Sequence, residues 1–246
     1  MIILIIQARL GSTRLPNKVL KEVNGVSLLK FQVERARQAK LVDKVIVATT
    51  SESRDVELVD YCKSNEIPVF IGSENDVLDR YYKCAKEYNA DVIVRLTADC
   101  PLIDPEIIDQ VIDLFLKNNV DFAANTVPPE TSKFPDGSDV EVFSMAALDR
   151  AQNECNDPFF REHVTFYFWK EQNGFSSSQL DYHSDYSKYR FTVDYPEDFE
   201  VVKMIIDELN KKNQFGHVDQ IVDIIESNKN IKEKNSKYYF GIGWKK

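Results

Sequence analysis

The sequence predicts an α/β protein with a Rossmann-like, doubly wound and mostly parallel sheet that carries helices on both faces. Residues 2–6 are five consecutive large apolar residues, which suits a strand buried on both faces of a parallel sheet. Short apolar runs then alternate with amphipathic segments at helical spacing, the pattern of strands joined by helices. With 246 residues, 43% of them hydrophobic, the chain is long enough to bury one sizeable core.

The expected elements follow one another along the chain in a regular order. Ser27 and Ser53 are expected to begin the first two helices, and the second helix should turn Val56, Val59 and Cys62 toward the core. We expect strands at residues 2–6, 44–49, 68–72, from 91 to just before 99, 121–126, 139–143 and 189–194. We expect helices at residues 27–40, from 53, after 72, and at 104–117, 144–154, 159–170, 196–211 and 218–227.

One domain is expected to cover residues 1–228, followed by a tail at 229–246. The tail begins rich in Lys and Asn and ends with several large apolar residues in its last nine positions. Because so much apolar surface is costly to expose, we expect the tail to pack on the domain or on a partner subunit, which allows a homodimer.

The first loop has the composition of an anion-binding site. Directly after the first strand come three cations (Arg9, Arg14 and Lys18), together with Gly11 and Ser12. Backbone N–H groups of such a loop bind phosphate, while arginine and lysine neutralise a polyphosphate. A solvated basic surface loop is the alternative. The loop matches neither G-x-x-x-x-G-K-[ST] nor G-x-G-x-x-G, which removes the main support for the usual ATPase and dinucleotide interpretations.

Two aspartates are expected at the ends of strands beside this loop. Asp99 follows an apolar run, and Asp104 with Pro105 at the first helical position is the better helix cap, which leaves Asp99 available. Asp194 precedes Pro196 in the same way, although capping of that helix is an alternative role for it. Since Mg²⁺ prefers one or two carboxylates plus phosphate oxygens and water, Asp99 and Asp194 form a predicted magnesium site.

Charge and cysteine content restrict the partners and the compartment. The net charge of −9 argues against general affinity for nucleic acid or anionic membranes, so we expect neither as a partner. The four cysteines show no C-x-x-C spacing, and no signal sequence or long apolar span precedes the first strand. The expected location is therefore the reducing cytoplasm, with the thiols buried as small hydrophobic groups.

The ordered motifs resemble a known family. The run Q-A-R-L-G-S-T-R-L-P-N-K resembles the triphosphate loop of nucleotidyltransferases that make nucleotide-activated sugars, with Asn17 where relatives usually carry glycine. T-A-D-C-P-L-I-D-P and V-D-Y-P-E-D-F are similar to the metal-binding segments of the same nucleotide-diphospho-sugar transferase superfamily. The chain is most similar to cytidylyltransferase-like proteins named after spore coat polysaccharide biosynthesis protein F, and more distantly to acylneuraminate and Kdo cytidylyltransferases. Asparagine tolerates the left-handed conformation, so we expect Asn17 to preserve the turn that glycine makes in relatives.

The resemblance implies roles for further residues. Arg80 in G-S-E-N-D-V-L-D-R-Y would face the nucleotide, although a lone helical arginine is as often a surface residue. P-D-G-S-D-V-E-V and R-E-H-V-T would line the acceptor pocket, although alternation alone would equally put Asp139 and Glu141 on a solvated strand face. His163 is either a structural histidine or a proton carrier. The predicted nucleotide-binding residues are Ala8, Arg9, Gly11, Ser12, Arg14, Lys18, Thr49, Arg80 and Thr97; the predicted acceptor-binding residues are Asp136, Asp139, Glu141, Arg161 and His163.

These observations lead to a functional hypothesis with alternatives. The chain is expected to be a Mg²⁺-dependent nucleotidyltransferase that moves CMP from CTP to a sugar or sugar-like acceptor and releases pyrophosphate, for surface polysaccharide synthesis. Arg9, Lys18, Asp99 and Asp194 are the predicted catalytic residues. One alternative is a nucleotidyltransferase that uses another nucleoside triphosphate and a sugar 1-phosphate. A second is a glycosyltransferase, although such enzymes usually have a D-x-D motif, and Asp99-Cys-Pro lacks the second Asp. A third is a non-catalytic nucleotide-binding regulator.

Overall fold

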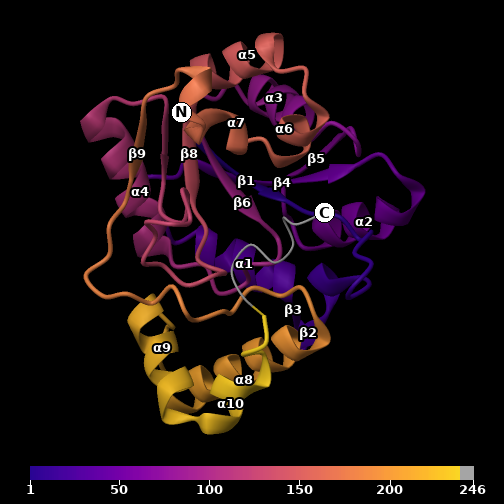
Figure 1. Ribbon diagram of the computed structural model, residues 1–246. Helices are drawn as coiled ribbons and strands as arrows, with labels where there is room; N and C mark the ends of the chain where they lie inside the picture. The colour runs from indigo at the N-terminus through magenta and orange to yellow at the C-terminus, as the bar shows by residue number, and fades with distance from the viewer. Residues whose placement is uncertain (239–246) are drawn as a thin grey trace.

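The computed structural model describes residues 1–238 and contains a central seven-stranded sheet (Figure 1). The strand order is β5-β4-β1-β6-β8-β7-β9, and β5, β4, β1 and β6 are mutually parallel. Strand β8 runs antiparallel between β6 and β7, so the predicted mostly parallel sheet is confirmed. The strands are β1 (Ile2–Gln7), β4 (Lys44–Thr50), β5 (Val69–Gly72), β6 (Val92–Thr97), β7 (Phe122–Ala124), β8 (Glu141–Ser144) and β9 (Ser177–Gln179), with a separate hairpin of β2 (Glu22–Val23) and β3 (Val26–Ser27).

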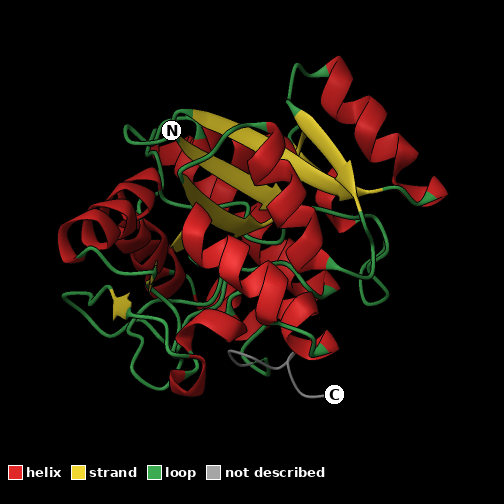
Figure 2. Cartoon of the chain, turned by 90° about the horizontal axis from the view of Figure 1, so that it is seen from above, coloured by secondary structure: helices red, strands yellow, loops and turns green. Residues whose placement is uncertain are grey.

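Helices cover both faces of this sheet, as the prediction required (Figure 2). In β1 the side chains alternate: Leu4 and Ile6 pack with α1, α2 and α4, whereas Ile3 and Ile5 pack with α3, α5 and α7. Burial on both faces explains why the strand is apolar at every position. The helices are α1 (Leu28–Ala36), α2 (Val56–Ser64), α3 (Val77–Glu87), α4 (Pro105–Asn118), α5 (Met145–Glu154), α6 (Pro158–His163), α7 (Phe166–Trp169), α8 (Pro196–Lys212), α9 (Val218–Ser227) and α10 (Lys229–Lys234).

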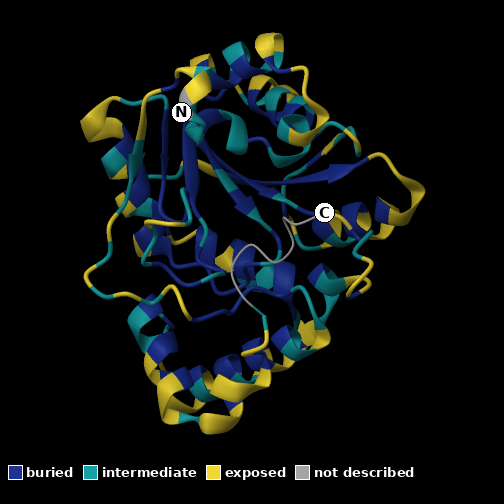
Figure 3. Cartoon of the chain, viewed as in Figure 1, coloured by how far each residue is buried: buried dark blue, intermediate teal, exposed yellow. Residues whose placement is uncertain are grey.

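A third hydrophobic cluster joins the C-terminal helices to the loops that follow β1 and β6. Helices α8, α9 and α10 form a group beside the β2–β3 hairpin (Figure 1). Their apolar faces are buried while their outer faces are exposed (Figure 3). Leu15 of the first loop and Leu102 belong to the same cluster as Val202 and Ile225. The C-terminal helices therefore support the loops that carry the predicted site.

Two predicted elements are wrong. Residues 189–194 form no strand; this segment is extended and makes one isolated bridge, Asp136 to Arg190. It remains outside the sheet because β6 already has partners, β1 and β8, on both of its edges. The predicted aromatic helix at 159–170 is broken into α6 and α7 by Val164, whose φ is 48°. This break buries Val164 completely.

Some smaller details of the prediction are confirmed, and others differ. Helix α1 ends at Ala36, earlier than expected. In α2, Val59 and Cys62 are buried as predicted, whereas Val56, the first residue of the helix after the 3-10 turn Ser53–Asp55, is exposed. Ser27 caps α1 as predicted, and the four cysteines are free and buried. In the part of the chain that is described, no helix combines the length and apolar character needed to cross a bilayer.

Candidate active site

A pocket of about 700 Å³ opens where β1 and β6 end. Its wall is built from the loop after β1, the segment after β6, the connection that precedes β8, and residues 190–194. The structure thus brings together the basic loop after β1 and the segments that carry Asp99 and Asp194. The sequence-predicted residues in the wall are Ala8, Arg9, Gly11, Ser12, Arg14, Lys18, Thr97, Asp99, Asp136, Asp139, Glu141, His163 and Asp194.

The basic loop after β1 is held in a defined conformation. The backbone N–H of Leu10 donates to Oδ1 of the fully buried Asp55 at 2.6 Å. Asn17 has φ 53°, so the left-handed turn expected there is confirmed. Gly11 lies against Arg54, and a Cβ at this position would come within 2.8 Å of the Arg54 Nε. These contacts fix the backbone that carries the cations.

Lys18 joins the two predicted metal ligands. Its Nζ donates to Asp99 Oδ2 at 3.1 Å, to Asp194 Oδ1 at 3.0 Å and to the carbonyl of Val193 at 2.8 Å. Burial alone would raise the pKa of Asp99, but the Lys18 charge and hydrogen bonding outweigh it and lower that pKa to about 2. Burial likewise opposes the charge of Lys18, yet the two carboxylates raise its pKa. Both aspartates therefore converge on a cationic position.

Arg190 organises the remaining acidic groups of the pocket. Its side chain is 5% exposed and contacts Asp136, Asp194 and Asp198, with Nη2 3.0 Å from Asp194 Oδ2. Asp198 also accepts hydrogen bonds from the backbone N–H groups of Asp194 and Tyr195. Asp194 is therefore held by Arg190, Arg14 and Lys18, and Asp198 rather than Asp194 caps the start of α8.

The connection before β8 brings two more aspartates to the pocket wall. Asp139 accepts from the Thr126 hydroxyl at 2.8 Å and from the Gly137 N–H at 3.1 Å. Burial raises the pKa of Asp139 to about 6, and burial with the Asp139 charge raises the pKa of Asp136. Gly137 has φ 108°, and a Cβ there would lie 2.4 Å from the Thr192 nitrogen, so glycine allows this connection to pack against residues 190–193.

Glu141 and Arg95 form the floor of the same half of the pocket. Arg95 of β6 pairs with Glu141 of β8, and the Thr165 hydroxyl donates to Glu141 Oε1 at 2.5 Å. The break at Val164 is what places Thr165 against Glu141. The ring of His163 stacks on Phe166 with centroids 5.0 Å apart, and both rings line the pocket. This half therefore combines carboxylates with an aromatic wall.

Comparison with known proteins agrees with the geometry. A family model described as cytidylyltransferase matches residues 3–240. The chain belongs to the cytidylyltransferase family. Spore coat polysaccharide biosynthesis protein SpsF of Bacillus subtilis is 32% identical over 86% of this chain and 88% of its own. A 3-deoxy-manno-octulosonate cytidylyltransferase of Chloroherpeton thalassium is 34% identical over 54% of each chain. The structure of a cytidylyltransferase from Leptospira borgpetersenii has a TM-score of 0.83 and 36% identity, covering 97% of this chain and 98% of its own.

The family assignment confirms the resemblance inferred from the motifs, and with it nucleotidyltransferase activity. Three of the predicted site residues nevertheless lie outside the pocket wall of this cytidylyltransferase. Thr49 is fully buried within β4. Arg80 is 1% exposed, and its Nη1 donates to the carbonyl of Ser73 at 2.8 Å. Arg161 pairs with Asp76 and donates to the carbonyl of Cys155, so it links α6 to the start of α3.

Several wall residues of the cytidylyltransferase pocket were not predicted. Arg190 and Arg95 lie within the motif stretches, four residues before Asp194 and Asp99 respectively, so a search for cations near those aspartates would have found them. Glu74 is paired with both Arg9 and Arg54, and nothing in its sequence context indicates this role. The other unpredicted residues of the wall are Gln7, Thr13, Val19, Asn75, Val77, Ala98, Cys100, Val127, Glu162, Phe166 and Thr192.

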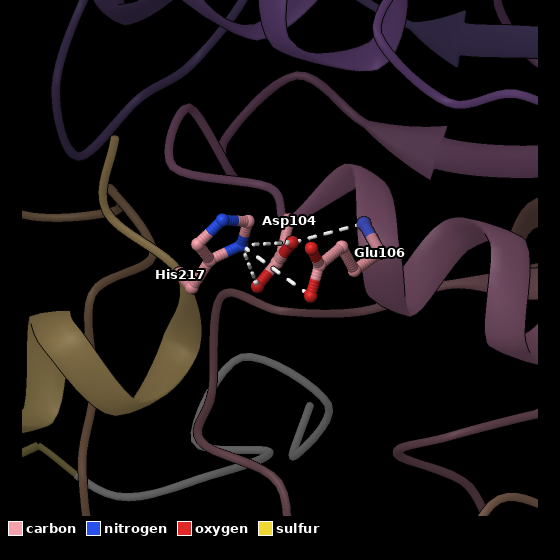
Figure 4. Close-up of side chains that lie close together, drawn as sticks. All are labelled: Asp104, Glu106 and His217. Atoms are coloured by element: carbon pink, nitrogen blue, oxygen red, sulfur yellow. Dashed lines mark hydrogen bonds and ion pairs between the residues drawn. The ribbon is translucent and has the colours of Figure 1, made fainter. Parts of the chain in front are cut away.

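A second group of possible metal ligands lies away from this pocket (Figure 4). Asp104, Glu106 and His217 come from the starts of α4 and α9. Asp104 accepts from the Glu106 N–H at 2.9 Å and the Val218 N–H at 3.1 Å, and its carboxylate lies 3.1 Å from His217 Nδ1. Because Asp104 already caps both helices, this group is a structural junction between α4 and α9.

The raised pKa of Asp139 predicts a pH-dependent effect of Asp139→Asn on stability. The folded protein binds this proton more tightly than the unfolded chain, so ionisation destabilises the fold as pH rises from 3.8 to about 6. Asparagine cannot ionise, but its amide cannot reproduce both hydrogen bonds that the Asp139 carboxylate accepts. We therefore expect Asp139→Asn to be about 2 kcal/mol more stable than the unsubstituted protein at pH 8, and no more stable at pH 4. Urea unfolding at both pH values measures this difference. An equal change at both would contradict the assignment.

Proposed function

We propose that this protein transfers CMP from CTP to a sugar or sugar-like acceptor in a Mg²⁺-dependent reaction that releases pyrophosphate. The observation that carries the proposal is the convergence of Asp99 and Asp194 on Lys18, beside a basic loop in one pocket. Membership of the cytidylyltransferase family supports the choice of CTP. The name of the Bacillus subtilis relative supports a product used in polysaccharide synthesis.

The donor set of the pocket fits a magnesium ion. Asp99 Oδ2 and Asp194 Oδ1 lie 3.1 Å and 3.0 Å from one ammonium nitrogen, so the two carboxylates already face a common cation. Two carboxylates, completed by phosphate oxygens and water, are a coordination that Mg²⁺ prefers. Asp99 and Asp194 would hold the ion, which when bound supplies positive charge to the phosphate oxygens.

The loop after β1 would bind the triphosphate. Arg9, Arg14 and Lys18 would neutralise the β- and γ-phosphates, and Ser12 would add a hydroxyl contact. Arg9 lies 3.7 Å from Glu74, and Arg14 lies 2.8 Å from Asp194. Phosphate oxygens would replace these carboxylates as partners of the two arginines. The loop therefore aligns the nucleotide and contributes charge rather than acid–base chemistry.

The opposite half of the pocket would bind the acceptor. Its two arginines, Arg95 and Arg190, are each committed to carboxylates of the protein. The wall formed by Asp136, Asp139 and Glu141 therefore offers hydrogen-bond acceptors, which suit the hydroxyl groups of a sugar. An acceptor oxygen attacks the α-phosphorus, the bond from that phosphorus to the β-phosphate oxygen breaks, and pyrophosphate leaves. An acceptor hydroxyl must also give up its proton, for which His163 and Asp139 are the nearby candidates.

The first test is thermal unfolding with CTP, GTP, UTP and ATP, each with and without Mg²⁺. A ligand that binds only the folded state raises the unfolding temperature by mass action. We expect a Mg²⁺-dependent increase with CTP alone. Pyrophosphate release with sugar phosphates and with ulosonic acids then identifies the acceptor. A response to another nucleoside triphosphate would change the donor, and a response only to nucleotide-sugars would replace the proposal by glycosyl transfer.

A further inference from the structure

The C-terminal segment packs beneath the carboxylates of the pocket. Ile231 of α10 is 1% exposed in the cluster formed by α8 and α9. Asn235 is also buried, and its side-chain amide donates to Asp198 Oδ1 at 2.9 Å and to the Arg190 carbonyl at 3.2 Å. Asp198 and Arg190 in turn hold Asp194. Residues that sequence analysis left without chemistry therefore contact the groups that fix a predicted metal ligand.

An aromatic stack extends this contact to the phosphate-binding loop. The rings of Tyr195 and Tyr238 are parallel within 6°, with centroids 3.9 Å apart. The guanidinium carbon of Arg14 lies 4.9 Å from the Tyr195 ring centroid, and Arg14 Nη1 donates to the Tyr195 hydroxyl at 3.2 Å. The Tyr238 hydroxyl donates to Glu197 Oε2 at 3.2 Å, which fixes the outer ring. Tyr195 thus contacts both Arg14 and Tyr238.

We infer that Tyr195 is a positioning residue for nucleotide binding and that Tyr238 holds it in place. The inference rests on the proposed function, in which Arg14 binds phosphate. The Arg14 side chain is 38% exposed, and a long side chain at such a site loses rotamer freedom when it binds a ligand. Contact with the Tyr195 ring and hydroxyl removes much of that freedom in advance.

The contact with Tyr195 also differs in kind from the ion pair with Asp194. If Asp194 held a metal ion, its pairing with Arg14 would weaken, whereas the neutral Tyr195 side chain would keep its contact with the guanidinium. Tyr195 therefore keeps the guanidinium beside the loop while the phosphates arrive. Residues 229–238, the described part of the C-terminal segment, contribute to nucleotide affinity by this route although none of them lies in the pocket wall.

The experiment compares Tyr195→Leu, Tyr195→Phe, Tyr238→Ala and Tyr238→Phe with the unchanged protein. The probes are CTP and inorganic tripolyphosphate, each with Mg²⁺, and binding is followed by titration calorimetry. We expect Tyr195→Leu to lower the affinity for both probes about five-fold and Tyr238→Ala to lower it about three-fold. The phenylalanine variants keep the rings, so their affinities should stay within about two-fold of that of the unsubstituted protein. In turnover assays the KM for nucleotide should rise while kcat changes little, since Arg14 binds ground and transition states alike.

A double-mutant cycle separates positioning from general damage to the fold. In an Arg14→Ala background, Tyr195→Leu should cause no further loss of affinity for either probe. The inference would be overturned if Tyr195→Leu lowered the affinity for the probes equally with and without Arg14. It would also be overturned if Tyr238→Ala lowered the unfolding temperature but left probe binding unchanged. Either result would leave the proposed function standing. If the unsubstituted protein bound neither probe, both the proposed function and the inference would be overturned.

Discussion

Asp99→Asn is expected to lower kcat for nucleotidyl transfer at least about 1,000-fold while the fold remains intact. Asp99 is one of the two carboxylates that face Lys18, and an amide cannot supply the charge that a divalent cation requires. The fold should survive because Lys18 keeps its contacts with Asp194 and the Val193 carbonyl. Pyrophosphate release measures the rate, and circular dichroism follows the fold.

A second readout distinguishes the loss of a metal ligand from other damage. The rise in unfolding temperature that CTP causes in the presence of Mg²⁺ should shrink in Asp99→Asn to the rise seen without Mg²⁺. Asp113→Asn is the matched control, because its carboxylate is 53% exposed on α4 and pairs only with Lys117 among the described residues. Turnover by Asp99→Asn near the unchanged rate would reject the metal assignment.

The parts of the fold that sequence predicted well are those in which one strong pattern decides the outcome. The unbroken apolar run of β1 predicted burial on both faces. The polar loop after it, where a site was expected, lies in the wall of a pocket at the strand end. Asn17 and Asp104 were predicted from backbone conformation and capping, which depend on neighbours along the chain. Local chemistry of this kind is visible in sequence.

The differences between the expected and the observed structure have another physical origin, because they depend on distant partners. The segment ending at Asp194 has strand-like composition, but the edges of β6 are occupied. It therefore makes three backbone hydrogen bonds with Asp136 and one with Asp99 instead of joining the sheet. Arg80 has helical spacing compatible with either role, and only packing shows that its guanidinium turns to the Ser73 carbonyl. Arg161 likewise finds Asp76, which is 85 residues away.

Lys18→Met should weaken both the fold and the activity, because it leaves two carboxylates facing each other without a cation. Removing one partner of a buried ion pair costs about 3–5 kcal/mol, so we expect a loss of that order in unfolding free energy at pH 7. The pKa of Asp99 is lowered to about 2 by Lys18, so the stabilisation is complete above pH 4 and disappears as pH falls toward 2. In the variant, burial without a cation raises the pKa of Asp99, so its deficit should begin to shrink above pH 4 and be smallest near pH 2, as measured by urea unfolding.

Magnesium provides the decisive comparison for this variant. A divalent cation between Asp99 and Asp194 would take over the charge that Lys18 supplies, so Mg²⁺ alone should raise the unfolding temperature of Lys18→Met more than that of the unchanged protein. Lys21→Met is the matched control. The Lys21 ammonium lies over the Phe199 ring, 5.6 Å from its centroid, and not between the two aspartates as that of Lys18 does. If Mg²⁺ stabilised Lys18→Met and Lys21→Met equally, the two carboxylates would not form a cation site, and Lys18 would be a structural residue whose loss lowers activity only by loosening the pocket.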